Sequence, residues 1–211
     1  SEVGHMNLGS GRAVRQDLVI INESIEKNTL TDKKEFKELI KHAQDGTKKI
    51  HLHGLLSDGG VHSHVDHLLH IHEKLSQYPD LKVYFHAFTD GRDTARDLGL
   101  KYTKVLQDNG IKIASMQGRS FGMDRDRRWE KIETAYKMIT GKGNISTDIN
   151  PVDYLENEYR NERFDEFVTP TLFIEEGKLE QDDAVFFLNF RPDRAIQITQ
   201  ALTLKKFPHF E

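Results

Sequence analysis

The feature that most constrains the fold is a repeated alternation between short β-rich runs and longer amphipathic segments. Runs rich in branched and aromatic residues predict five strands: Lys49–Leu56, Lys82–Phe88, Ile111–Gln117, Thr171–Ile174 and Ala184–Phe190. Helical periodicity predicts seven helices: Val14–Lys27, Asp32–Gln44, Val65–Gln77, Leu98–Asp108, Asp126–Ile139, Pro151–Tyr159 and Asp193–Leu204. Such alternation is typical of α/β proteins, so we expect a mostly parallel central sheet flanked by helices on both faces, a three-layer α/β/α arrangement.

Composition narrows the class of protein. The chain has 211 residues, of which 36% are hydrophobic and 30% charged, and this suffices for one good core or one core with an appendage. Because it contains no cysteine, disulfides and thiolate metal sites are excluded. No apolar run approaches the roughly 18 residues that span a bilayer, so we expect a soluble, cytoplasmic protein without a membrane partner. The net charge of −4 argues against nucleic acid as a partner.

The loops expected after the strands are rich in arginine. They read "SDGGVHSH" after the first strand, "TDGRDT" after the second, "GRSFGMDRDRR" after the third and "RPDR" after the last. Ligands of open α/β sheets bind at the carboxyl ends of the strands, and guanidinium groups suit phosphate or carboxylate. We therefore expect five arginines to surround one crevice for a small ligand with two or three negative charges: Arg92, Arg119, Arg125, Arg191 and Arg194. The alternative is that these arginines are solvated or paired with nearby acids, namely Asp90, Asp93, Asp124 and Asp193.

Glycines in the same loops refine the ligand class. Gly59 and Gly60, Gly91, and Gly118 allow tight turns and a close approach of backbone amides to an anion. The sequence has no GxxxxGK[ST] motif, and no GxGxxG opens a helix. A nucleotide is therefore not the expected ligand.

Seven histidines lie between residues 51 and 72. Strand alternation places His51 and His53 on one face of the first strand, whereas His67, His70 and His72 lie on the next helix, so we do not expect these side chains to converge. The helix histidines predict a polar or half-buried helix surface. His62 follows the Gly-Gly turn at the level of the arginines and is the best candidate to contact an anion or a hydroxyl.

Two alternatives of other classes remain open at this point. His67 and His70, at positions i and i+3, could supply half of a zinc site, which would indicate a histidine-rich metal-dependent hydrolase. The arginine-rich crevice alone would also suit a non-catalytic domain that binds a phosphorylated metabolite.

Several motifs together carry a resemblance to a known family. "SEVGHMN", "SDGGVHSH", "HAFTDGRDT", "MDRDRRW" and "FFLNFRPDRAIQ" occur in this order and closely resemble the cofactor-independent (2,3-bisphosphoglycerate-independent) phosphoglycerate mutases, over essentially the whole chain. The resemblance implies two α/β domains, one phosphatase-like with two manganese ions and a nucleophilic serine, the other a phosphotransferase domain. It implies that residues 1–15 are a short remnant of the metal-binding domain with the hinge. Residues 16–211 would then form the phosphotransferase, or substrate-binding, domain.

The resemblance also implies an activity and its residues. The complete enzyme interconverts 3-phosphoglycerate and 2-phosphoglycerate in glycolysis and gluconeogenesis through a phosphoserine intermediate, without 2,3-bisphosphoglycerate. Ser1 is implied as the nucleophile and as a manganese ligand, and Asp93 as the group that accepts and returns the hydroxyl proton. The implied substrate contacts are Arg191 and Arg194 to the phosphate, His62, Arg92 and Asp93 to the glycerate, and Arg119 and Arg125 to the carboxylate.

The remaining metal ligands implied by the resemblance lie outside this chain. We therefore expect no complete manganese site here, a chain that is inactive alone because Ser1 is not activated, a monomer, and the phosphatase-like domain as a partner. The chain departs from the family at His53, which usually is Met, and at Ser120-Phe121-Gly122, where bulky aromatics and Ala are usual. The second departure predicts a looser wall between Arg119 and Arg125.

Overall fold

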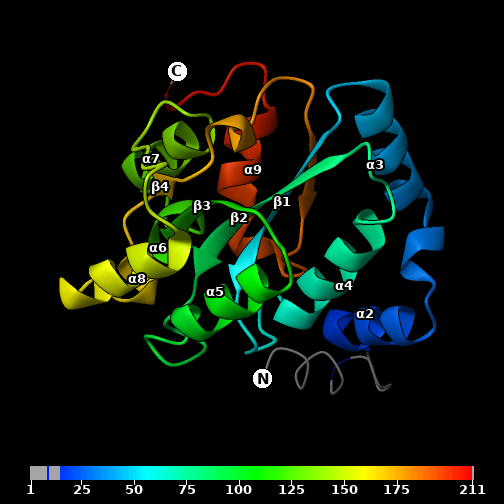
Figure 1. Cartoon of the computed structure of the whole chain (residues 1–211), viewed down its shortest axis with the longest axis horizontal. Coiled ribbons are helices and arrows are strands. Elements are labelled where there is room, and N and C mark those ends of the chain that lie inside the picture. The colour runs from blue at the N-terminus through cyan, green and yellow to red at the C-terminus, as the bar shows by residue number, and fades with distance from the viewer. Residues whose placement is uncertain (1–8, 10–14, 211) are drawn as a thin grey trace.

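A five-stranded, mostly parallel sheet lies at the centre of the computed structural model, which describes residues 9 and 15–210 (Figure 1). The strands are β1 (Lys49–Leu56), β2 (Lys82–Thr89), β3 (Ile113–Gly118), β4 (Thr171–Leu172) and β5 (Ala184–Phe187). Their order is β4-β3-β2-β1-β5, with only the short β4 antiparallel to its neighbour. The predicted sheet is thus confirmed.

Helices cover both faces of this sheet. They are α2 (Asp17–Glu26), α3 (Lys34–Asp45), α4 (Val65–Leu75), α5 (Gly99–Asp108), α6 (Arg119–Gly122), α7 (Trp129–Ile139), α8 (Pro151–Arg160) and α9 (Ile196–Thr203). Buried side chains of α3, α4, α5 and α8 belong to one hydrophobic cluster, and those of α7 and α9 belong to another. Figure 1 shows α7 and α9 on the opposite side of the sheet from α3 and α4. The three-layer α/β/α expectation is confirmed.

Local sequence explains where several helices begin. Asn150 caps α8 by accepting hydrogen bonds from the backbone N–H of Val152 and Asp153, with Pro151 in the first turn. The ring of His64 caps α4 in the same way, because Nδ1 accepts from the backbone N–H of Asp66 at 3.2 Å. One of the seven clustered histidines therefore has a structural role.

Several expected elements are shorter than predicted, among them β4 and α4, and for three others the local contacts are clear. The helix expected from Asp126 begins at Trp129, because the Asp124 carboxylate accepts the backbone N–H groups of Asp126 and Arg128 and holds a turn there. The last helix begins at Ile196, because residues 192–194 form a 3₁₀ turn. The last strand ends at Phe187, and beyond it the side-chain oxygen of Asn189 accepts the N–H of Leu55.

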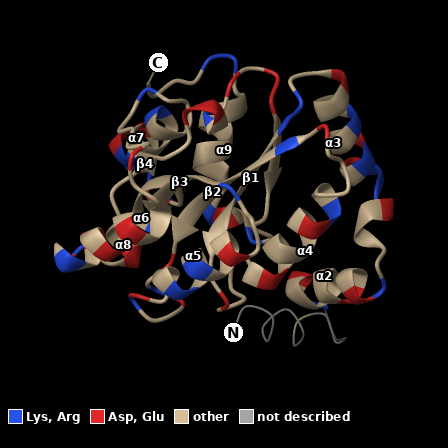
Figure 2. Cartoon of the chain, viewed as in Figure 1, with Lys and Arg blue, Asp and Glu red and all other residues tan. Residues whose placement is uncertain are grey.

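The surface is of mixed charge. Figure 2 shows basic and acidic side chains interspersed along the outer helices in this view. None of the helices in the described ranges is long and apolar enough to cross a lipid bilayer. An anion would therefore be attracted by local groups rather than by the charge of a whole face.

The topology gathers the loops of interest at one edge. Four of the strands, β1, β2, β3 and β5, are parallel, so their carboxyl ends lie at the same edge. The strands β2, β3 and β4 follow one another on one side of β1, whereas β5 lies on the other side of β1. In open α/β sheets such a change of side opens a crevice at the carboxyl ends of the strands.

Candidate functional site

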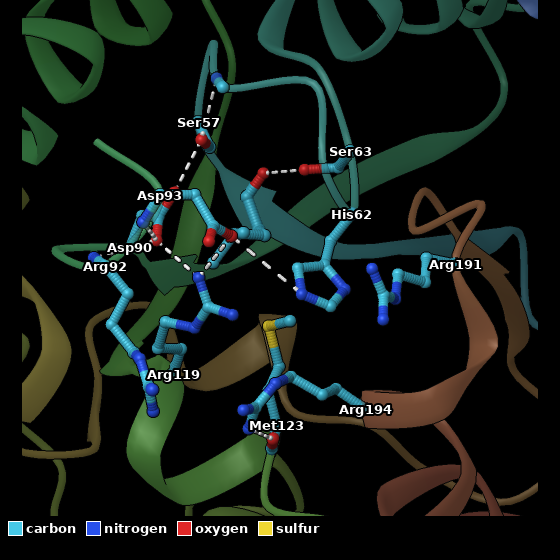
Figure 3. A network of polar contacts seen from close by, with 12 residues as sticks. Ser57, His62, Ser63, Asp90, Arg92, Asp93, Arg119, Met123, Arg191 and Arg194 are labelled. Carbon is cyan, nitrogen blue, oxygen red and sulfur yellow. Dashed lines mark hydrogen bonds and ion pairs between the residues drawn. The ribbon is translucent and has the colours of Figure 1, made fainter. Parts of the chain in front are cut away.

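A buried carboxylate, Asp90, organises the carboxyl edge of the sheet (Figure 3). It accepts hydrogen bonds from Ser57 Oγ at 2.6 Å, from Arg119 Nη1 at 2.5 Å and from the backbone N–H groups of Arg92 and Asp93 at 3.1 Å. Burial alone would raise the pKa of Asp90, but the bonds from Ser57, Asp93 and Arg119 bring that pKa below its ordinary value. The loops after β1, β2 and β3 are thereby tied together.

Arg119 connects this buried carboxylate to a more exposed one. Only 2% of Arg119 is exposed, and its Nη1 also donates to Asp93 Oδ2 at 2.6 Å. Burial opposes the charge of Arg119, yet its bonds to Asp93 and Asp90 raise its pKa above the ordinary value. The side chain of Asp93 stays 21% exposed, so its carboxylate is oriented and still accessible to a ligand.

His62 lies between two carboxylates without bonding to either. Its Nε2 is 3.9 Å from Asp93 Oδ2 and its Nδ1 is 3.7 Å from Asp193 Oδ1, and both distances are too long for hydrogen bonds. Burial, together with the charge of Arg119, lowers the pKa of His62 to about 4. The ring is therefore neutral at pH 7, and its buried Nδ1 has no hydrogen-bond partner among the described residues.

Asp193 pairs with two of the expected arginines. It accepts from Arg191 Nε at 3.0 Å and from Arg125 Nη1 at 2.8 Å. Burial would raise the pKa of Asp193, but these cations lower it below the ordinary value. The alternative of pairing with nearby acids therefore holds for Arg125 and Arg191, and it also holds for Arg119.

Arg194 differs from them. It is 9% exposed and donates from Nη1 to the carbonyl of Met123 at 3.1 Å, and no carboxylate of the described residues lies within 4.0 Å of its guanidinium. Burial lowers the pKa of Arg194, and the nearby charges of Arg119, Arg125 and Arg92 lower it further. A buried cation in such surroundings is stabilised by an anionic ligand.

The five arginines reach the same edge of the sheet but form two groups. Three of them, Arg92, Arg119 and Arg194, line a cavity of about 170 Å³, whereas Arg125 lines a neighbouring hollow of about 490 Å³ together with Asp193. In Figure 3 Arg191 lies beside His62, at a distance from Arg92. Because His62 faces both Asp93 and Asp193, it connects the two groups.

Two residues at this edge were not expected from the sequence, and one expected residue is not described. Ser57 bonds to Asp90 and directly follows β1, a position that could have singled it out. Glu166, in the short turn η2 (Asp165–Phe167), lies 3.5 Å from Arg92 Nη1 and carries no motif. Ser1, the expected nucleophile, lies outside the described residues.

Most of the histidines have structural partners. His51 Nδ1 lies 2.9 Å from His86 Nε2, His51 Nε2 lies 3.1 Å from Asp183 Oδ2, and His86 Nδ1 lies 2.8 Å from Ser115 Oγ. The expectation of a half-buried helix surface is wrong for His67, which is 3% exposed and bonds to Asn22 across the contact with α2.

A metal centre finds no support among these histidines. Within residues 9 and 15–210 no group of three or more histidine or acidic side chains could hold a metal ion. The zinc alternative, and with it the histidine-rich hydrolase, is not favoured.

Comparison with known proteins gives a consistent picture. The family described as "BPG-independent PGAM N-terminus (iPGM_N)" matches residues 21–211. Proteins named 2,3-bisphosphoglycerate-independent phosphoglycerate mutase from Listeria welshimeri and Clostridium novyi are 42% and 44% identical over all of this chain, which spans 43% of their length. A solved structure of Leishmania mexicana phosphoglycerate mutase at low cobalt concentration has a TM-score of 0.85 and 26% identity, over 95% of this chain and 40% of that one.

Proposed function

Because the chain belongs to the 2,3-bisphosphoglycerate-independent phosphoglycerate mutase family, we propose that residues 16–211 are the substrate-binding phosphotransferase domain of a longer enzyme. That enzyme interconverts 3-phosphoglycerate and 2-phosphoglycerate in the cytoplasm, in glycolysis and gluconeogenesis, without 2,3-bisphosphoglycerate. The observation that carries the proposal is the meeting of Asp93, His62 and the arginines at the carboxyl edge of four parallel strands. The relatives' greater length leaves room for a second, phosphatase-like domain.

The contacts support different roles in the reaction for these side chains. We propose that Asp93 accepts the proton of the reacting hydroxyl and returns it, since Arg119 orients its carboxylate and leaves it accessible. The neutral ring of His62 and the half-exposed Arg92 would orient the glycerate. Catalysis of this kind rests on positioning and on neutralisation of charge.

The arginines would hold the two anionic ends of the substrate. We propose that Arg191 and Arg194 contact the phosphate, and that Arg119 and Arg125 contact the carboxylate. Arg119 uses Nη1 for both aspartates, and its Nε is buried with no partner in the described structure, so it retains a donor. Arg125 is about half exposed and would share its pairing with Asp193 when a ligand binds.

The two manganese ions implied by the family do not fit the described part of this chain, which offers no cluster of ligands for them. We propose that ligands in the remaining length of the enzyme hold these ions, together with Ser1 of this chain. No step at the arginine site is derived through them.

Reconstitution tests the proposal. The chain alone, with Mn²⁺ and 3-phosphoglycerate, should give no turnover, and addition of the separately expressed metal-binding domain should restore mutase activity. Titration calorimetry should also detect 3-phosphoglycerate binding to the chain alone. A chain that fails to bind this substrate would contradict the proposal, and turnover by the chain alone that a chelator abolishes would favour the hydrolase. Binding without activity in the presence of the second domain would favour a non-catalytic phosphometabolite-binding domain.

A further inference from the structure

The cavity of about 170 Å³ holds two polar side chains that the proposed substrate contacts do not include, Ser120 and Lys131. The hydroxyl of Ser120 is buried and has no hydrogen-bond partner in the described part of the chain. Lys131 Nζ lies over the ring of Phe121 at 5.8 Å, and no carboxylate of the described residues lies within 4.0 Å of it. Buried polar groups normally have partners, so the Ser120 hydroxyl indicates that something else completes the cavity. Lys131, which is partly exposed, adds a cation with no acidic partner in the described part of the chain.

The charge of the lining indicates the sign of that partner. The lining has five cationic residues, Arg92, Arg119, Arg128, Lys131 and Arg194, and two acidic ones, Asp124 and Glu166. Arg119 is already neutralised by Asp90 and Asp93, and the other four cations still outnumber the two acids. Asp124 already has its own partners, because it accepts from Arg128 Nε at 2.7 Å and from two backbone N–H groups. Neither acid lies within 4.0 Å of Arg194 or Lys131, so an anion is the complementary ligand.

The size of the cavity limits what this anion can be. The volume of the cavity, about 170 Å³, is small. Sites for drug-sized ligands begin at about 300 Å³. The cavity therefore suits one small anionic group.

The number of donors favours phosphate over carboxylate. Ser120, Lys131 and Arg194 all line the cavity and carry a hydroxyl, an ammonium and a guanidinium as hydrogen-bond donors. A carboxylate has two oxygens to meet these donors, whereas a phosphate group has three or four and a higher charge.

We propose that Ser120 and Lys131, together with Arg194, form a subsite for a phosphate group. The subsite shares Arg194 with the phosphate contacts proposed above, and Arg191, which is paired with Asp193, would contact the same phosphate from the second group of cations. This subsite adds detail to the proposed function and rests on that function only for the source of the anion. The anion is either the phosphate of the substrate or free inorganic phosphate.

Titration of inorganic phosphate into the chain at low salt tests the subsite. Lys131→Met should weaken phosphate binding about tenfold and Ser120→Ala several-fold, since each removes a donor to the anion. Lys101→Met is the matched control, because Lys101 also lies over a ring, that of Tyr102 at 5.1 Å, but does not line the cavity. The control removes the same charge and should change binding less than twofold, and Lys131→Arg should retain most of the affinity. Circular dichroism will verify that all variants are folded.

The same variants titrated with 3-phosphoglycerate distinguish the two sources. If the substrate phosphate occupies the subsite, Lys131→Met weakens both ligands and inorganic phosphate competes with 3-phosphoglycerate. If only inorganic phosphate binding weakens, the subsite holds free phosphate. If Lys131→Met and Ser120→Ala bind inorganic phosphate as Lys101→Met does, the subsite is wrong. In that case Arg191→Ala can still abolish 3-phosphoglycerate binding, so the proposed function would stand independently.

Discussion

Arg119 and Asp93 form an ion pair of 2.6 Å although they belong to the loops after different strands. The same Nη1 of Arg119 bonds to the buried Asp90 at 2.5 Å, so one guanidinium orients both a buried carboxylate and the carboxylate that we propose as the proton acceptor. The accessible carboxylate is thereby held at a defined place before any ligand arrives. Preorganisation of this kind lowers the cost of reaching a reactive arrangement.

Replacement of Arg119 by Met should destabilise the fold, because it leaves the buried carboxylate of Asp90 without its cation. Loss of one partner from a buried pair typically costs about 3–5 kcal/mol of the free energy of unfolding. Urea denaturation monitored by circular dichroism measures this loss. Arg92→Met is the control: its side chain is 53% exposed and 3.5 Å from Glu166, so about 1 kcal/mol or less is expected. Equal losses of unfolding free energy in the two variants would show that the buried ion pair stabilises the fold no more than the exposed one.

Binding of 3-phosphoglycerate to the chain should depend on the arginines of the loop after β5. Arg191→Ala and Arg194→Ala should each cost on the order of 1.5–3 kcal/mol of binding free energy, through loss of charge-assisted hydrogen bonds. Overall affinity should be weak, on the order of millimolar to tens of micromolar, and should fall with added salt. Titration calorimetry measures both effects.

Two histidines of α4 serve as negative controls for this binding experiment. His70→Ala and His67→Ala should leave the affinity almost unchanged, because neither side chain lines the cavity beside Arg194. His67 does bond to Asn22, so its variant is compared only at temperatures where it is folded. Losses as large as those of the arginine variants would mean that the site has been misplaced.

Strand periodicity was sufficient to predict the sheet and the edge at which the arginines gather, because parallel strands end on the same side. It could not predict how the arginines divide into two groups, since that depends on which acid each guanidinium reaches. Asp193 is close to Arg191 in sequence. Arg92 meets Glu166 only because η2 packs on β3, and the end of β2 bonds to η2 through the Thr89 hydroxyl and the Asp165 carbonyl. The looser wall expected around Ser120-Phe121-Gly122 stays a prediction.

Gly118→Ala should displace η2 and disturb the site. Gly118 has φ −66°, which any residue adopts, so the effect is purely steric. An added Cβ would lie 2.3 Å from the carbonyl oxygen of Glu166 and 2.7 Å from the nitrogen of Phe167, both in the backbone. Overpacking of this kind costs about 1–3 kcal/mol of stability, and we expect weaker 3-phosphoglycerate binding as Glu166 shifts from Arg92. Thermal denaturation and calorimetry measure the two effects. Unchanged stability would mean that η2 moves away from the added Cβ without a cost in free energy.

Acid sensitivity should come from the buried histidines of β1 and β2. Strand alternation predicted that His51 and His53 share a face, but their contacts with His86 on β2 and with Asp183, which lies 132 positions from His51, required the folded chain. His53 stacks on His86 at a centroid distance of 4.4 Å, and neither ring nitrogen of His53 has a hydrogen-bond partner among the described residues. These rings are therefore held in a neutral, desolvated state.

Lowering the pH should destabilise the chain through these rings. Burial lowers the pKa of His51 to about 4 and that of His53 to about 3, whereas both would titrate near 6.5 in the unfolded chain. Between pH 6.5 and 4 the unfolded state binds more protons, so the free energy of unfolding falls with falling pH, by about 1.4 kcal/mol per pH unit for each group. Above pH 6.5 the contribution of these groups is complete and constant. Urea denaturation at a series of pH values measures this slope. His53→Met places an apolar side chain between Phe88 and Phe187 and removes one titrating group, so it should reduce the slope by the contribution of one histidine. An unchanged slope in that variant would mean that His53 does not control the acid response.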